Sequence, residues 1–293
     1  MMDRLQEWAA TQDYRVGAGK ARPVLEKVQK RWSAWGQTAS DQGLYGRLWR
    51  NWTHLRESVA KDWSVVVVAK QAIAERMLIP LPHGEVPLVI APASRHLPRW
   101  VEQVKNELSR WCAPHEVIRL RAPFKGVAAQ LGMFQYGRNH ILYDPQWGSF
   151  LQLACYLIQT DITSFEGVEL AVLADQCEGC HRCVKHCPTG ALSQDHRLLE
   201  YSRCLAYGRQ EVEIERGCSL GCLSCQGSCP MNNDRLVCQN LDCPLSRAEV
   251  VELLDDGKEI SPSVHQKIEE LGLAHHIEEL RITLRAASQR MTS

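Results

Sequence analysis

Apolar residues in the first sixty positions recur at helical intervals within a polar background. The stretches RPVLEKVQKRW and YGRLWRNWTHLRESVAK have the three- and four-residue spacing of amphipathic helices. Gly17, Gly19, Gly36 and Gly43 interrupt the pattern, and we interpret these glycines as breaks between helices. The pattern predicts a helical N-terminal segment over residues 1–60.

The pattern then changes to short, continuous apolar runs. WSVVVVAK (63–70) and VPLVIAPA (86–93) are rich in β-branched residues, as is typical of strands that are buried on both faces. LPRWVEQVKNELSRWCA (97–113) returns to helical spacing, and HEVIRL (115–120) has the pattern of a further strand.

The run FLQLACYLIQT (150–160) fits either a buried helix or a buried strand. Strands that alternate with a helix predict an α/β or α+β domain over residues 61–170. Cys112 and Cys155 lie in these apolar runs, so we expect them to be inert thiols of the core.

Helical spacing returns at the C-terminal end of the chain. It covers residues 246–255, where Ser246 is a candidate N-cap, and residues 261–288. We therefore expect a helical tail over residues 246–293.

Composition adds the most informative feature, because eleven of the 13 cysteines fall between residues 177 and 243. The N-terminal sequence shows neither a secretion signal nor a twin-arginine signal, which predicts a cytoplasmic protein. Disulfides are disfavoured in that compartment, so metal binding becomes the leading interpretation. We expect a cysteine-rich module over residues 171–245.

The first cysteine run, CEGCHRCVKHCP, has the spacing of bacterial ferredoxins. Cys177, Cys180 and Cys183 are separated by two-residue gaps, and Cys187 follows after three residues with Pro188 behind it. Two-residue gaps allow one tight loop to direct three thiolates toward the irons of one cluster. Zinc sites also use paired C-x2-C units, but zinc would leave the third cysteine and the Cys-Pro ending unused. The spacing therefore favours iron–sulfur clusters.

A second run, CLSCQGSCP, repeats the same ending at Cys222, Cys225 and Cys229. In two-cluster ferredoxins the fourth cysteine of each run ligates the other cluster. This exchange predicts two [4Fe-4S] clusters, one bound by the first three cysteines of the first run with Cys229. The other cluster takes Cys187, Cys222, Cys225 and one more thiol, for which Cys204 and Cys218 compete.

The formal net charge is zero, with 34 basic and 34 acidic residues. This balance does not indicate nucleic acid or an anionic membrane as a partner, although it does not exclude tRNA. No run of eighteen apolar residues is present, so we expect no membrane partner.

The cysteine runs and the RCLAY stretch between them resemble the double-cluster module of epoxyqueuosine reductases and of their relatives, the corrinoid-dependent reductive dehalogenases. The segment APFKGVAAQLGMFQYGRNHILYDPQWGSFLQLACYLIQTDI (122–162) is also similar to that family. The chain looks closest to a cytoplasmic subgroup of double-cluster proteins that carry YGRN and GSF.

The resemblance implies that the α/β region cradles a cobalamin, to which the clusters deliver electrons. It favours Cys204 over Cys218 as the eighth ligand. It also makes Tyr136, Arg138 and Asn139 candidates for cofactor contacts, with a glycine-containing turn as the alternative interpretation. The family carries a proton-donating aspartate where this chain has Leu120, so epoxyqueuosine reduction itself is in doubt, and no catalytic residue is predicted.

Two functions follow from these features. The first is a corrinoid-dependent reductase that acts on a small-molecule or tRNA substrate. The second is a cobalamin-free electron-transfer protein that reduces a partner enzyme. Both need an electron donor such as a flavodoxin or a ferredoxin. A purely structural use is disfavoured, since one metal ion would suffice to hold a loop.

Overall fold

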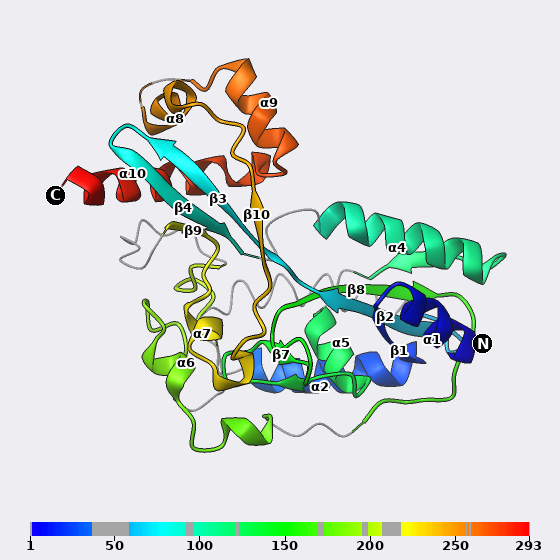
Figure 1. Ribbon diagram of the computed structural model, residues 1–293. Helices are drawn as coiled ribbons and strands as arrows, with labels where there is room; N and C mark the ends of the chain where they lie inside the picture. Colours follow the sequence, from blue (N-terminus) through cyan, green and yellow to red (C-terminus); the bar gives the residue numbers. More distant parts are fainter. Residues whose placement is uncertain are drawn as a thin grey trace. The chain divides into compact units, whose positions relative to one another are not determined.

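The computed structural model describes residues 2–36, 59–91, 97–120, 123–168, 173–194, 199–206, 218–255, 257 and 259–292. These residues form a mixed fold of helices and strands, so the predicted fold class is confirmed (Figure 1). The chain divides into two compact units, and each is described by itself. The tryptophan-rich stretch around residues 45–58, which was expected to be helical, lies outside the described residues.

The first unit comprises residues 1–71, 98–204 and 224–235. Its main sheet has the strand order β1-β2-β8-β5, and all neighbouring strands are antiparallel. The bounds of these strands are β1 Arg15–Lys20, β2 Ser64–Gln71, β5 Val117–Arg119 and β8 Leu151–Ile158. The segment left open between helix and strand is therefore the strand β8, whose register joins Val67 to Cys155.

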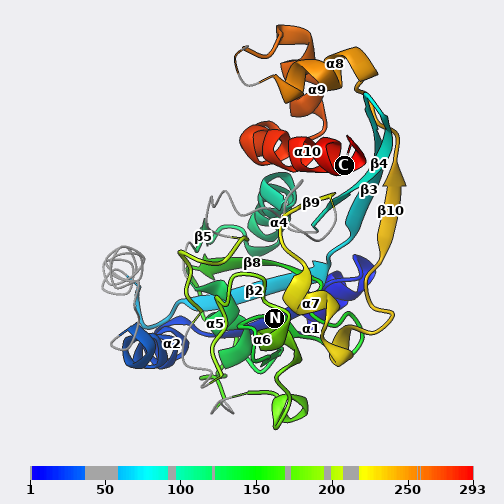
Figure 2. The same cartoon turned by 90° about the vertical axis from the view of Figure 1, so that its left-hand side faces the viewer.

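Helices cover both faces of this sheet, which explains the unbroken apolar run of β2. Helix α4 (Leu97–Cys112) lies on one face, and α2 (Ala21–Gly36) and α5 (Phe124–Gln130) lie on the other (Figure 2). The first six residues of β2 are buried, as predicted for a strand covered on both sides. The unit also contains α1 (Met2–Thr11), the short hairpin β6 (Gln135–Tyr136) and β7 (Leu142–Tyr143), and the small helices η1 (Asp175–Cys177), α6 (Arg182–Lys185), α7 (Ser224–Gly227) and η2 (Pro230–Asn232).

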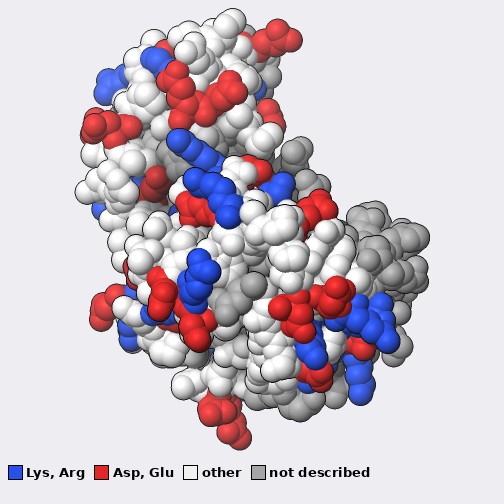
Figure 3. Space-filling model, turned by 90° about the vertical axis from the view of Figure 1, so that its right-hand side faces the viewer, with Lys and Arg blue, Asp and Glu red and all other residues white. Residues whose placement is uncertain are grey.

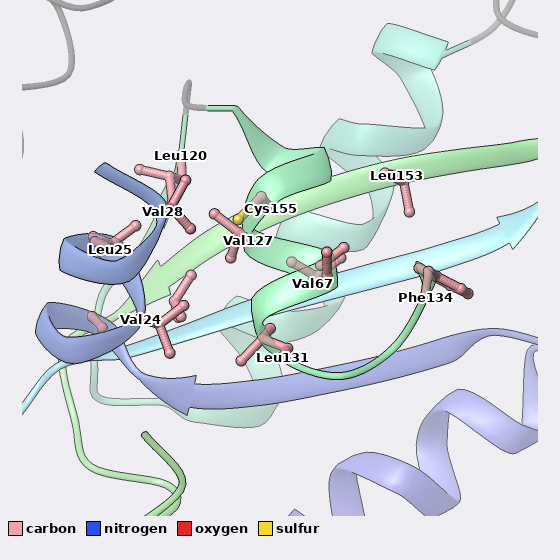
Figure 4. Packing of buried hydrophobic residues seen from close by; sticks show 14 of the residues in the cluster. Val24, Leu25, Val28, Val67, Leu120, Val127, Leu131, Phe134, Leu153 and Cys155 are labelled. Atoms are coloured by element: carbon pink, nitrogen blue, oxygen red, sulfur yellow. The ribbon is translucent and has the colours of Figure 1, made fainter. Parts of the chain in front are cut away.

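The core on the α2 and α5 side is made of aliphatic side chains from distant parts of the chain. Figure 4 shows Leu120 beside Val28, and Val127 of α5 between Cys155 of β8 and the strand β2. Leu120 is only 3% exposed and belongs to this core. Burial raises the pKa of the Cys155 thiol, and it raises the pKa of the Cys112 thiol to about 11. Both thiols are buried, as expected of core cysteines.

The N-terminal segment differs from the predicted all-helical segment, because strand β1 lies between α1 and α2. Gly17 and Gly19, which were interpreted as helix breaks, are residues of this strand. A Cβ atom at Gly17 would lie 2.6 Å from the side chain of Met133, and one at Gly19 would lie 2.7 Å from Leu131. The glycines therefore allow side chains from the loop after α5 to pack directly on the strand backbone.

The second unit comprises residues 72–97, 205–223 and 236–293. The domain boundaries at 61, 171 and 246 stay a prediction. The sheet of the second unit has the order β10-β3-β4-β9, with β3 and β4 antiparallel and both outer strands parallel to their neighbours. The bounds are β3 Ala74–Leu81, β4 Gly84–Ile90, β9 Cys218–Leu220 and β10 Cys238–Leu241. The apolar run at 86–93 is thus the second strand of a hairpin in a different sheet from β2.

Helices α8 (Arg247–Leu254), α9 (Pro262–Glu270) and α10 (Ile277–Thr292) pack with this sheet around a second aliphatic core. Ser246 caps α8 as predicted, and it forms a capping box with Glu249. The helical pattern at 261–288 forms two helices rather than one, because Gly272 has a φ of +70° and the helix η3 (Ala274–His276) separates α9 from α10. A left-handed glycine ends a helix at low conformational cost, which explains the break.

Candidate metal centre

Four of the predicted cluster ligands line one cavity in the first unit. Cys177, Cys180, Cys183 and Cys229 surround a space of about 280 Å³, together with side chains that include Arg138, Asn139 and Tyr143. These are the four cysteines that the ferredoxin exchange assigns to one cluster. Cys177, at the end of η1, and Cys229, before η2, lie 52 positions apart in the chain.

Local structure explains how the first run presents its thiols. Gly179 has a φ of +66°, which allows the chain to turn sharply between Cys177 and Cys180. The amide of Cys180 donates to the carbonyl of Cys177 at 3.2 Å and closes this turn. Cys183 lies in the short helix α6, where its side chain is 8% exposed.

The cavity suits a cluster better than a single metal ion. A tetrahedral zinc ion holds its sulfur ligands at about 2.3 Å, whereas a [4Fe-4S] cluster places a cube of iron and sulfide between its four thiolates. Among the residues that the structure describes, no group of three metal-ligating side chains is arranged to hold one ion. Four thiols around an open space are the donor set that a [4Fe-4S] cluster uses.

Burial and hydrogen bonds set the electrostatics of these thiols. Burial raises the pKa of Cys183 to about 11 and also raises the pKa of Cys177. The backbone amide of Arg138 donates to the Cys177 sulfur at 3.4 Å, which opposes this effect. A metal centre requires the thiolate form, so its positive charge must replace the thiol protons when it binds.

Arg138 fixes the position of the first cysteine in two further ways. Its guanidinium donates to the carbonyl oxygen of Cys177 at 2.6 Å and to that of Gln194 at 3.1 Å. The side chain is 5% exposed. Arg138 therefore connects Cys177, the first cysteine of the run, with Gln194, which follows the run in the chain.

The three residues named as cofactor contacts do not share one environment. Arg138 and Asn139 line the cysteine cavity. Tyr136 instead belongs to the apolar core, and the Arg31 guanidinium lies over its ring at 5.6 Å. Gly137 to Ile141 form a turn, in which the amide of Gly137 donates to the carbonyl of Ile141 at 2.8 Å. Their contact with a corrinoid stays a prediction.

Three of the cysteines predicted for the other cluster lie around a small apolar group. Cys187, Cys204 and Cys225 pack against Ala191, Leu192 and Leu199. Cys222 lies between the bend at Gly221 and α7, three positions before Cys225. The alternative ligand Cys218 is a residue of β9, where it pairs with Leu88 of β4. Cys238 is exposed and Cys243 is half-buried in the second unit.

The sequence did not predict a group of buried polar side chains that holds the second cysteine run in place. Asn232 accepts from the Ser149 amide at 2.8 Å and donates to the Ser149 hydroxyl at 2.8 Å and to the Gln226 carbonyl at 2.8 Å. Asn232 is 6% exposed and Ser149 is 4% exposed. The only signal in the sequence was the GSF motif, which the resemblance singled out without a role.

Residues 176–232 match the family profile described as the 4Fe-4S double cluster binding domain. The chain thus contains a domain of the class that binds two [4Fe-4S] clusters, which agrees with the cavity and the second group of cysteines. Among the residues described here, no helix has the length and apolar character needed to cross a membrane.

The predicted resemblance to epoxyqueuosine reductases is also confirmed. The enzyme of Bacillus cereus is 30% identical over 116 residues, which are 37% of this chain and 29% of that protein. The enzyme of Lactococcus garvieae is 33% identical over 114 residues, or 36% of this chain and 31% of that protein. The matched segments span about a third of the length of these curated relatives.

The fold as a whole is similar to solved epoxyqueuosine reductases. The structure from Bacillus subtilis, in which a catalytic aspartate loop is swung out of the active site, has a TM-score of 0.65 at 17% identity and covers 99% of this chain and 82% of that one. Another epoxyqueuosine reductase, solved with an epoxyqueuosine-modified tRNA stem loop, has a TM-score of 0.60 at 14% identity, with 99% and 83% covered.

Proposed function

We propose that the protein is an iron–sulfur reductase with two [4Fe-4S] clusters, of the corrinoid-dependent epoxyqueuosine reductase type. The observation that carries the proposal is the convergence of Cys177, Cys180, Cys183 and Cys229 on one cavity. When bound, the clusters supply single electrons at low potential. The spacing of the two runs assigns Cys187, Cys222 and Cys225 to the other cluster, and the family resemblance adds Cys204. Cys204 is preferred to Cys218 because it packs beside Cys187 and Cys225.

The residues of the chain hold and insulate these groups. The Arg138 amide stabilises negative charge on the Cys177 sulfur, and its side chain fixes the loop. The apolar group at Ala191, Leu192 and Leu199 covers part of three of the other thiols, those of Cys187, Cys204 and Cys225. Apolar cover lowers the local dielectric constant and so strengthens electrostatic contacts with these thiols.

A corrinoid and a tRNA substrate belong to the same proposal. The support for tRNA is the fold similarity to a reductase solved with a tRNA stem loop, and the support for a corrinoid is the resemblance of residues 122–162 to the same family. Positive and negative side chains are interspersed on the face in Figure 3, so on this face a tRNA would be recognised through local contacts. The cytoplasmic location stays a prediction.

One observation favours the second candidate, a cobalamin-free electron-transfer protein. Position 120, where the family has its proton donor, carries a leucine that is buried in the aliphatic core. The aliphatic side chain of leucine has no proton that it could donate to a substrate. The electron-transfer function requires the clusters and a docking partner but no proton donor.

Anaerobic purification tests for the two iron–sulfur clusters, which both candidate functions require. The holoprotein is expected to contain about eight iron atoms per chain and to lose its broad visible absorption when reduced with dithionite. A colourless protein that contains zinc would refute the proposal. Gel filtration after incubation with cob(II)alamin then separates the candidates. Co-elution of corrinoid with protein supports the reductase, and its absence supports the electron-transfer protein.

A further inference from the structure

Cys229 reaches the cavity from a segment that contains only two very short helices. It lies between α7, which has four residues, and η2, which has three. Helices of this length are not stable by themselves, so contacts with the rest of the first unit must hold the segment. Three such contacts converge on the side chain of Asn232, three positions after Cys229.

The backbone of Cys229 is held on both sides. Its amide donates to the Gln226 carbonyl at 3.1 Å, and its carbonyl accepts from the Asn232 backbone amide at 3.0 Å. The Asn232 side chain donates to the same Gln226 carbonyl at 2.8 Å. These hydrogen bonds form a closed ring, which restricts the directions in which the Cys229 side chain can point.

Asn232 also joins this ring to Ser149, which lies two positions before β8 of the main sheet. The Asn232 side-chain oxygen accepts from the Ser149 backbone amide at 2.8 Å, and its nitrogen donates to the Ser149 hydroxyl at 2.8 Å. The Gln226 side chain donates to the same hydroxyl at 2.9 Å. Asn232 and Ser149 are both buried, and a hydrogen bond in such a place is electrostatically stronger than one in water.

The partners of Asn232 require a carboxamide in one orientation. The Ser149 backbone amide can only donate and the Gln226 carbonyl can only accept, so the side-chain oxygen faces the first and the nitrogen faces the second. Rotation of the carboxamide by 180° would place donor against donor and acceptor against acceptor. Both protons of the nitrogen are used, one on the Gln226 carbonyl and one on the Ser149 hydroxyl.

The first cysteine run is positioned by different contacts. The Arg138 guanidinium donates to the Cys177 carbonyl at 2.6 Å, and the Cys180 amide donates to the same carbonyl at 3.2 Å. Neither of these bonds involves Asn232. A change at Asn232 should therefore loosen Cys229 and leave the first run in place.

We propose that Asn232 is a positioning residue that holds Cys229 at the cavity and so keeps the fourth thiolate on the cluster there. The inference rests on the proposed function, which makes Cys229 a ligand. Groups that orient a metal ligand from behind determine how firmly it binds the metal. Without Asn232, Cys229 leaves the cluster more often, while the three thiolates of the first run stay bound.

Alkylation of the anaerobic holoprotein with iodoacetamide, read by mass spectrometry, measures how often each thiol leaves its iron. Cys238 is exposed and shows that the reagent reacts. Asn232→Ala is expected to keep about eight iron atoms per chain. It should raise the initial rate of Cys229 alkylation about tenfold, because three hydrogen bonds are lost. The rates of the first-run cysteines in the cavity should not change, whereas a general loss of stability would raise all of them together.

Gln130→Ala is the matched control. It removes another buried carboxamide of the first unit, which donates to the Val168 carbonyl and is not among the residues that line the cavity. The alkylation rate of Cys229 should stay at the wild-type value in this variant. An increase as large as that in Asn232→Ala would show that lost stability is the cause, and would overturn the inference.

The remaining outcomes separate the inference from the function on which it rests. Wild-type protein without iron would refute the proposed function. Clusters that stay intact in Asn232→Ala with an unchanged Cys229 rate would overturn the role of Asn232 and leave the function standing. If Asn232→Ala loses iron or does not fold, Ser149→Ala decides, since it removes the hydroxyl and keeps both backbone hydrogen bonds of that residue. It should raise the Cys229 rate by a smaller factor, and an unchanged rate there would overturn the inference.

Discussion

At the scale of single residues, Cys183 connects the cavity to the apolar group beside it. Its side chain lines the cavity and also packs with Ala191, Leu192 and Leu199. We expect Cys183→Ser to reduce the iron content from about eight to about four atoms per chain, because one cluster loses a ligand. Iron analysis with protein quantification measures this change.

Cys155→Ser is the control for that variant. Cys155 is also buried, but it belongs to the core of β8 and α5 (Figure 4) and is not among the residues that line the cavity. Its substitution should lower stability and leave the iron content unchanged. Full iron content in Cys183→Ser would contradict the ligand assignment.

Gly148 controls the contact between the GSF motif and the second cysteine run. Its φ is +61°, and a Cβ atom there would collide with the Asn232 side chain. Gly148→Ala is therefore expected to destabilise the first unit by more than about 1 kcal/mol. Gly227→Ala is the control, since a Cβ atom there meets nothing within 4 Å. Thermal unfolding followed by visible absorption measures both, and equal melting temperatures would refute the steric argument.

At the scale of elements, helix α8 depends on the capping box that begins it. The Ser246 hydroxyl accepts from the Glu249 amide, and the Glu249 carboxylate accepts from the Ser246 amide at 2.8 Å. Ser246→Ala should cost about 1 kcal/mol of unfolding free energy in the second unit. Ser288→Ala, within α10, should be neutral or stabilising because alanine favours helix interiors. Denaturant titration followed by circular dichroism distinguishes the two, and a similar result for both would exclude the cap as the cause.

The pairing of α8 with α9 should depend on pH. The Lys267 ammonium, at 2.7 Å, and then the Ser246 amide and hydroxyl lower the pKa of Glu249 from 4.5 to about 2. A carboxyl whose pKa is lowered on folding stabilises the protein above its unfolded pKa, and this contribution is lost as the pH falls through the folded value. The stability difference between wild type and Glu249→Gln should therefore be largest above pH 4.5 and shrink toward pH 2. A difference that does not change over this range would show that the ion pair has no net effect.

At the scale of the whole molecule, each compact unit has an aliphatic core of its own. One core is built on β2, β8, α2 and α5, and the other on β3, β4 and the helices α8 to α10. Removal of iron with a chelator under anaerobic conditions is expected to lower the unfolding temperature of the first unit more than that of the second. Hydrogen exchange read by mass spectrometry assigns the change to segments. Equal loss of protection in α4 and α10 would contradict this division.

Local sequence patterns were sufficient to predict the elements that need no special contact with distant residues. The valine run of β2, the amphipathic helix α4 and the cap of α8 follow from periodicity and from one side chain. Strand β1 could not be predicted in this way, because Gly17 and Gly19 disfavour a strand in isolation. They are required there by Leu131 and Met133, which are more than a hundred positions away in the chain.

The amino-acid sequence alone determined the kind of metal chemistry, because ligand spacing within a loop is a local property. Cys177 to Cys187 and Cys222 to Cys229 have ferredoxin spacing whatever surrounds them. The exchange of the fourth cysteines also predicted that Cys229 joins the first three cysteines of the first run, as the cavity shows. Only the tertiary structure decided which polar groups reach these sulfurs. The bonds from Ser149 to Asn232 span 83 positions, and Arg138 reaches Cys177 across 39. Such contacts depend on how strands and turns pack, which no local pattern of residues specifies.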